Sequence, residues 1–148
     1  MNKILFFADR FYYEENGRTL TGQSYTREKY GPVPAGLDAA LLRLARAKKL
    51  VTRRIDFHGY PKDEFISLVE PDLSNLSKEE IIFLVKLADV ICNEHTARSI
   101  SEVSHDIVWN SAEEGETIPM NAYLVAKAGE IRQSDMRWAK NIVSKLVS

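Results

Sequence analysis

The sequence contains few of the residues and patterns that catalysis, disulfide bonding or membrane insertion would need. Its 148 residues include one cysteine, Cys92, so no intramolecular disulfide can form, which fits a reducing compartment. No apolar run approaches the roughly 20 residues that cross a bilayer. The opening apolar stretch meets Asp9 and Arg10 too soon for a secretory signal. We therefore expect a cytoplasmic protein, with Cys92 buried on the apolar stripe of a helix.

Motifs for metals, phosphates and nucleophilic catalysis are missing as well. His58, His95 and His105 do not have metal-ligand spacing, and the seven glycines form no phosphate-binding motif. A GxSxG nucleophile motif is not present either. The sequence thus predicts no enzyme, no cofactor and no metal site. A formal net charge of -1 provides no overall attraction to nucleic acid or to an anionic membrane.

Hydrophobic periodicity predicts a largely helical single domain spanning residues 1–148. We expect helices over residues 2–15, 35–49, 77–94 and 134–147, and a shorter one over 99–106. Asn16-Gly17 should end the first helix, and Ser77 with Glu80 should form a capping box that opens the third. In the second helix, Leu37, Leu41, Leu44 and Ala45 are expected to face inward.

A β-hairpin is predicted between the second and third of these helices. Residues 50–57 and 64–69 have strand character, and residues 58–63 have turn chemistry. Such a hairpin is marginal alone and should pack on the helices. Residues 18–34 are too rich in glycine and proline for a long regular element. The predicted fold class is mainly α with a small antiparallel β-hairpin, an α+β and winged-helix-like arrangement.

A basic segment follows the second predicted helix into the hairpin. It holds six cations and no acidic residue: Arg43, Arg46, Lys48, Lys49, Arg53 and Arg54. On a winged helix these side chains could contact DNA phosphates. The alternative is a solvated surface, with cations that complement the dipole at a helix C-terminus.

The first thirty residues are rich in aromatic side chains, which cannot all point to one side of a helix. Core packing explains most of them, but exposed tyrosines are favoured anchors of protein interfaces. Tyr13, Tyr25 and Tyr30 are therefore candidates for a partner surface. Residues 30–34 are stiff because Pro32 and Pro34 fix their own φ and extend the preceding residues.

An ordered series of short motifs resembles the Panacea (SocA-like) antitoxin domain of bacteria and phages. It covers about the first 110 residues. The series consists of Leu5-Phe6-Phe7-Ala8-Asp9-Arg10, Gly17-Arg18, Thr21-Gly22, Lys29-Tyr30-Gly31-Pro32-Val33-Pro34, Val103-Ser104-His105 and Trp109. The resemblance implies a mainly helical, non-enzymatic domain with a small β element. It also implies a role as an antitoxin that neutralises a cognate protein toxin by direct binding.

The family motif and the aromatic content together give a set of candidate partner-binding residues. These are Asp9, Arg10, Tyr13, Tyr25, Tyr30, Pro32, Pro34, His105 and Trp109. Some positions have an alternative structural role. His105 could be a core histidine bound by a backbone carbonyl or by Asp9, and Trp109 could serve packing. Asp9 could cap or pair internally.

Two other functions compete with the antitoxin interpretation. The basic segment is compatible with a winged-helix DNA-binding regulator, including one that regulates its own gene, and any protein-binding surface is compatible with a proteolytic adaptor. Residues 115–148 match no part of the motif series. This variable, helical C-terminal part is expected either to select the toxin or to form a homodimer contact.

Overall fold

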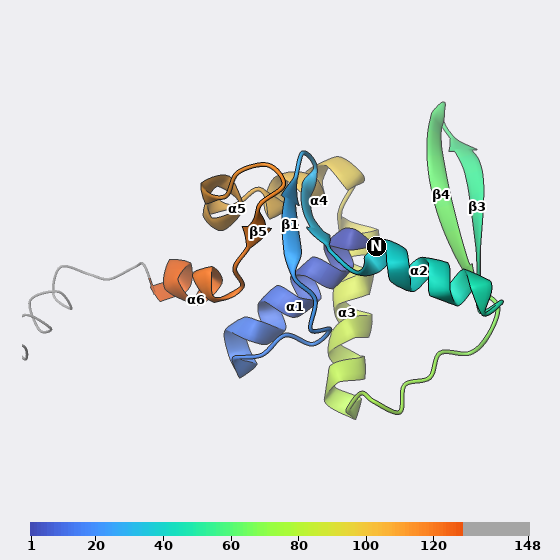
Figure 1. Cartoon of the computed structure of the whole chain (residues 1–148), viewed down its shortest axis with the longest axis horizontal. Helices are drawn as coiled ribbons and strands as arrows, with labels where there is room; N and C mark the ends of the chain where they lie inside the picture. Colours follow the sequence, from blue (N-terminus) through green and yellow to red (C-terminus); the bar gives the residue numbers. More distant parts are fainter. Residues whose placement is uncertain (129–148) are drawn as a thin grey trace, which may run out of the picture.

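The computed structural model describes residues 1–128 (Figure 1). Its helices are α1 (Asn2–Asn16), α2 (Leu37–Arg46), α3 (Lys78–Glu94), α4 (Ala97–Ser104), α5 (Ile107–Ser111) and α6 (Asn121–Ala128). Its strands are β1 (Tyr25–Glu28), β2 (Gly31–Pro34), β3 (Leu50–Phe57), β4 (Tyr60–Ser67) and β5 (Thr117–Ile118). The helix predicted over residues 134–147 lies outside the described residues.

Helix α1 lies at the centre of the fold and ends where the sequence predicts. Gly17 closes its last turn in the left-handed conformation, with φ of 69°, and donates its N–H to the carbonyl of Tyr13. The helix buries Phe6, Phe7 and Ala8 in consecutive positions. These side chains cover a wide arc of the helix, so α1 needs packing partners on more than one side.

A three-stranded antiparallel sheet, in the order β2-β1-β5, provides one of these partners. Strands β1 and β2 form a hairpin in which Tyr25 pairs with Pro34 and Glu28 with Gly31. Strand β5 pairs Ile118 with Tyr25 from more than ninety residues away. The sequence analysis predicts no sheet here, because strands of two to four residues are too short for a recognisable alternation.

The hydrophobic core is built mainly from aromatic rings around Phe6. Its ring centroid lies 5.1 Å from that of Phe7, 5.4 Å from Tyr25 and 5.9 Å from Tyr123, all in edge-to-face geometry. Such pairs contribute about 0.5–1.5 kcal/mol each beyond the burial of their surface. The rest of the core comes from α3, α4, α5 and β5, through Ile91, Ile100, Val108, Trp109 and Ile118.

Helix α3 confirms the predicted capping box and corrects the prediction for Cys92. Ser77 accepts a hydrogen bond from the N–H of Glu80, whose carboxylate accepts one from the N–H of Ser77. Glu80 also accepts from the Tyr12 hydroxyl at 2.6 Å, which joins α3 to α1. The prediction of a buried Cys92 is wrong, since this side chain is exposed.

Residues 35–70, which we call the arm, comprise α2 and the β3–β4 hairpin and project to one side of the fold (Figure 1). We call residues 1–34 and 71–128 the body. No residue of the arm is buried. The inward orientation predicted for Leu44 and Ala45 is wrong, because both side chains are exposed, that of Leu44 by 40%. The predicted hairpin is confirmed, although β4 begins four residues earlier than expected.

The fold class is α+β, with mainly helical elements and small antiparallel sheets, as predicted. The winged-helix arrangement is not confirmed: the hairpin contacts α2 and otherwise mainly itself, rather than packing across a helical layer. Among residues 1–128, no helix is both long and apolar enough to cross a membrane. Nor does that part of the chain gather three or more His, Cys, Asp or Glu side chains suited to holding a metal ion.

Candidate partner-binding surface

Asp9 is completely buried and ties the loop after α1 to the helix. Its carboxylate accepts hydrogen bonds from the N–H groups of Leu20 and Thr21 and from the Tyr25 hydroxyl, each at 2.7 Å. The Thr21 hydroxyl donates a further one. Burial and the neighbouring carboxylate raise the pKa of Tyr25, which therefore stays neutral. Asp9 and Tyr25 thus hold the fold from inside and present no surface to a partner.

The segment Gly31–Pro34 also lies inside, against α1 and α4. Pro32 and Pro34 are buried, so their rings pack within the body. Gly31 has φ of 104°, and a Cβ atom there would overlap the Lys3 amine and the Ser104 hydroxyl. The motif requires glycine at this position for both reasons: the positive φ and the close approach of two side chains.

Tyr30 is the exception, because it occupies the two-residue turn between β1 and β2 and is 72% exposed. Its backbone is held in place, whereas most of its ring is exposed. The Tyr30 carbonyl accepts hydrogen bonds from the Lys3 amine and from the Ser101 hydroxyl, the latter at 2.7 Å. The Lys29 amine lies 5.3 Å from the centre of the Tyr30 ring. We call Lys29 and Tyr30 the Tyr30 turn.

His105 and Trp109 lie on opposite sides of a helix break and nevertheless stack. Asp106 starts α5 by accepting hydrogen bonds from the N–H groups of Val108 and Trp109, each at 3.0 Å. The His105 and Trp109 rings are 3.9 Å apart, with 12° between their planes. The Arg27 guanidinium lies 4.2 Å from the Trp109 ring. The two rings thus stack although no continuous helix joins residues 105 and 109.

The aromatic stack and the arginine beside it contain buried nitrogen atoms that have no hydrogen-bond partner among the described residues. Arg27 Nε, His105 Nε2 and Trp109 Nε1 are each inaccessible and make no hydrogen bond there. The pKa of His105 is lowered by burial and by the positive charge of Lys3, a shift that the Tyr30 carbonyl partly offsets. The lowered pKa favours the neutral form of the His105 ring, and Asp9 is not among its hydrogen-bond partners in the described residues.

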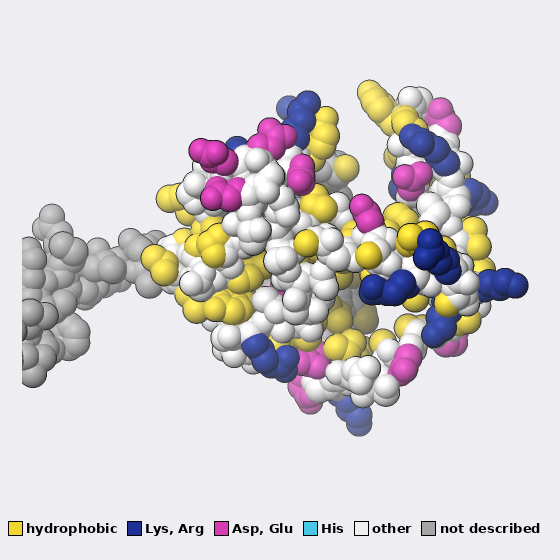
Figure 2. Space-filling view, viewed as in Figure 1, with side chains coloured by type: hydrophobic (Ala, Val, Ile, Leu, Met, Phe, Trp, Pro, Cys, Tyr) yellow, Lys and Arg dark blue, Asp and Glu magenta, His cyan; other side chains and the backbone are white. Residues whose placement is uncertain are grey.

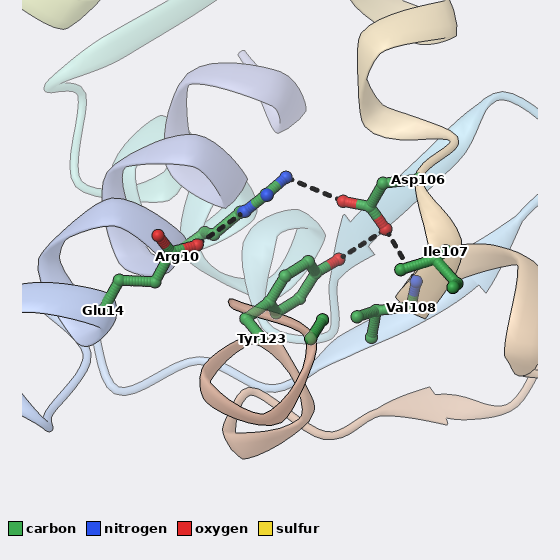
Figure 3. Close-up of a pocket in the computed structure, with 7 residues that line it drawn as sticks. Arg10, Glu14, Asp106, Ile107, Val108 and Tyr123 are labelled. Atoms are coloured by element: carbon green, nitrogen blue, oxygen red, sulfur yellow. Dashed lines mark hydrogen bonds and ion pairs between the residues drawn. The ribbon is translucent and has the colours of Figure 1, made fainter. Parts of the chain in front are cut away.

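Arg10 connects α1 to the start of α5 and borders a shallow pocket (Figure 3). It donates hydrogen bonds to Glu14 at 3.0 Å and to Asp106 at 2.7 Å, and its guanidinium lies 4.4 Å from the Tyr123 ring. The pocket holds about 300 Å³. Two carboxylates neutralise the arginine, so we assign Arg10 to fold stabilisation rather than to recognition of an anion.

The remaining candidates lie on the surface or at its edge. Tyr13 is half-buried on α1, and the cations at the end of α2, Arg43, Arg46, Lys48 and Lys49, are all exposed. In the hairpin, Arg53 donates to Glu64 at 3.1 Å and Arg54 faces Asp63 across the strand pair. Of the six cations predicted to contact DNA phosphates, four therefore lie at the end of α2 and two lie beside carboxylates in the hairpin.

Sequence reasoning misses Lys3, Ser101 and Arg27, which position the Tyr30 turn and the aromatic stack. Lys3 reaches across 27 residues and Ser101 across 71, separations over which a periodic pattern carries no information. The only available signal is Gly31, since a glycine between a tyrosine and a proline indicates a backbone position that another element approaches closely.

Comparison with known protein families identifies the same part of the chain as the motif series does. The family model for the antitoxin SocA-like, Panacea domain matches residues 1–110, which include the Asp9 centre, the Tyr30 turn and the His105–Trp109 stack. No curated protein matches the chain, and no solved structure does. The family match covers well over half of the sequence, and the chain therefore belongs to the SocA-like antitoxin family with a Panacea domain.

Proposed function

We propose that this protein is an antitoxin that neutralises a cognate protein toxin by direct binding, with the Tyr30 turn as one anchor of the contact. Family membership supports the antitoxin role. The observation that carries the anchor is the contrast at Tyr30 between a fixed backbone and a ring that is 72% exposed. We further propose that this is a bacterial or phage protein, that it acts in the cytoplasm, and that it is not an enzyme.

The physical reason is pre-organisation. A tyrosine ring brings a large contact area with few rotatable bonds, and residues of this type dominate binding energy in protein interfaces. Because Lys3 and Ser101 already fix the Tyr30 backbone, little conformational freedom remains to be lost when a partner binds. An exposed ring on a fixed turn is well suited to insertion into a pocket of the partner.

Co-expression with the product of a neighbouring open reading frame tests the proposal. We expect that product alone to arrest growth, and growth to return when this chain is co-expressed. Tyr30→Ala should weaken neutralisation, with an affinity loss of about 2 kcal/mol, or roughly thirtyfold. Tyr30→Phe is the matched control, since it keeps the ring and should neutralise nearly as well as the wild type.

Val125→Ala controls for general truncation of an exposed apolar side chain, because Val125 is 71% exposed on α6. If Tyr30→Ala neutralises as well as Val125→Ala, the turn is not an anchor. If no neighbouring gene product is toxic in the absence of this chain, the antitoxin proposal itself fails. A co-expressed toxin that is degraded rather than held in a complex would indicate an adaptor.

A DNA-binding regulator is the second candidate, and the four exposed cations at the end of α2 are the observation that favours it. The ion pair between Arg53 and Glu64 in the hairpin weakens this candidate, because it leaves fewer cations for phosphate contacts. Mobility-shift titration against the chain's own upstream region, at two salt concentrations, tests it. Binding must fall steeply as salt rises if phosphate contacts are involved.

A further inference from the structure

The arm presents apolar side chains that the rest of residues 1–128 leaves exposed. The strand register places five of them on one face of the hairpin, where successive residues of each strand alternate between faces. They are Val51, Ile55, Phe57, Tyr60 and Ile66. Val51 is 44% exposed, Phe57 53% and Tyr60 75%. A two-stranded hairpin is marginally stable alone, so a face of this kind gains stability from a covering surface.

Pairing of two arms through their strand edges is disfavoured by charge. Strand β3 carries Arg53 and Arg54 at its middle, and β4 carries Asp63 and Glu64 at its middle. A two-fold pairing of β3 with β3, or of β4 with β4, would place like charges opposite each other, which destabilises a sheet. Edge pairing would also extend the sheet without covering either of its faces, so it would leave the Val51 face exposed.

Helix α3 of the body carries an exposed stripe that fits this requirement. Ile82, Val85, Asp89 and Cys92 follow one another at spacings of three, four and three residues, which places them along one side of the helix. Ile82 is 54% exposed, Val85 is 64% exposed, and Cys92 is also exposed. The stripe therefore presents apolar surface that the described residues leave uncovered.

The charges of the two regions are complementary. The arm holds seven Lys and Arg against five Asp and Glu, a formal net of +2. The body holds nine against 14, a formal net of -5, and α3 itself carries four carboxylates against two lysines. Figure 2 shows Lys and Arg side chains, with Asp and Glu side chains between them, over α2 and the hairpin, and a group of Asp and Glu side chains over the α5 side of the body.

We propose that two copies of this chain form a dimer by reciprocal exchange of arms, in which the Val51 face of each arm covers the Ile82–Val85 stripe on α3 of the other copy. A second copy supplies one arm and one α3 stripe. In a two-fold dimer, each of the two arms therefore covers one of the two stripes, and no apolar surface of either kind is left over. The proposal concerns α3 and the arm, whereas the Tyr30 turn stays free for a toxin. It does not depend on the antitoxin role.

The first test is the molar mass of the purified full chain, measured by light scattering across a dilution series. We expect a species of twice the chain mass of 16.9 kDa that dissociates on dilution. Val85→Glu should raise the dissociation constant at least about tenfold, because it places a charge on the apolar stripe. Val103→Glu is the matched control: Val103 is 51% exposed on α4, outside the proposed contact, and this variant should dimerise normally.

The second test separates arm exchange from other dimers. Val51→Glu on the arm and Val85→Glu on α3 should each weaken dimerisation. When the two variants are mixed, one of the two reciprocal contacts contains only unaltered surfaces, so a heterodimer should form more tightly than either variant associates with itself. Circular dichroism of both variants controls for loss of the fold.

Three results would overturn the proposal. These are a wild-type chain that is monomeric at every concentration, a Val85→Glu variant that dimerises like the wild type, and a mixture that associates no better than its separate variants. None of these results bears on neutralisation, which the co-expression experiment measures independently.

Discussion

The body and the arm have similar proportions of apolar residues but use them in opposite ways. In the body, Phe6, Tyr25 and Tyr123 are almost fully buried, and the Phe6 ring contacts both tyrosine rings edge to face. In the arm, Phe57, Tyr60 and Leu42 are each more than half exposed. The difference between the body and the arm shows that a hydrophobic pattern identifies an apolar surface, but does not indicate whether the same chain or another molecule buries that surface.

The sharpest way to test the comparison is to remove one phenylalanine from each region. Phe6→Ala should reduce the free energy of unfolding by about 3–5 kcal/mol, because it empties the centre of the aromatic cluster. Phe57→Ala should reduce it by less than about 1 kcal/mol. Denaturant unfolding at one fixed protein concentration, low enough for the chain to be monomeric, measures both. Equal losses would mean that the arm is packed as tightly as the body.

A second pair of variants compares aspartates that accept hydrogen bonds from the backbone. Asp9→Asn should cost about 2–4 kcal/mol of unfolding free energy, because its buried oxygens serve two backbone amides and two hydroxyls. Among residues 1–128, Asp56 accepts a hydrogen bond only from the N–H of Gly59, at the exposed hairpin turn. Asp56→Asn should therefore change stability by no more than about 0.5 kcal/mol. A small effect of Asp9→Asn would contradict its assignment as the internal tie.

A third pair separates backbone strain from crowding. Gly31 and Gly59 both have positive φ, 104° and 83°, but an added Cβ meets other atoms only at Gly31. Alanine should cost about 1 kcal/mol at Gly59 from strain alone, and about 1–3 kcal/mol more at Gly31. Thermal unfolding of the two variants gives the difference. Similar costs at both positions would show that the Lys3 and Ser104 contacts are unimportant.

The smallest expected effect concerns pH. Burial lowers the pKa of His105 in the folded protein, so the unfolded chain binds more protons once pH falls below about 6.5. Stability contributed by the neutral ring is therefore present near pH 7 and is lost as pH falls toward 5. His105→Gln should flatten this dependence of unfolding free energy on pH. A dependence on pH that stays the same in His105→Gln would exclude His105 as its source.

Features governed by neighbouring residues could be predicted from the sequence, and features governed by distant contacts could not. The Ser77–Glu80 capping box, the Gly17 helix end and the β3–β4 hairpin all depend on a few adjacent residues, and all are observed. The β1–β5 pairing joins segments about ninety residues apart, and it was not anticipated. The prediction that Cys92 is buried is wrong because helical periodicity identifies an apolar stripe on a helix but does not show whether another element covers that stripe.

In the candidate site, too, the features set by neighbouring residues could be predicted and those set by distant contacts could not. The motif identified Tyr30, Gly31 and Pro32 as one stiff segment, yet Tyr30 points outward while Gly31 and Pro32 are buried. That difference arises from the two-residue turn and from the approach of Lys3 and Ser104, which the local sequence does not contain. Asp9 and Tyr25 proved to be hydrogen-bonded partners inside the body, a pairing that no spacing rule indicates.

The most direct test of the central claim is growth under co-expression of the neighbouring gene product with the wild type, Tyr30→Phe or Tyr30→Ala. We predict growth arrest without this chain, full rescue by the wild type and by Tyr30→Phe, and weakened rescue by Tyr30→Ala at equal protein levels. A neighbouring product that is harmless on its own, or a toxic one that this chain neither binds nor neutralises, would contradict the account.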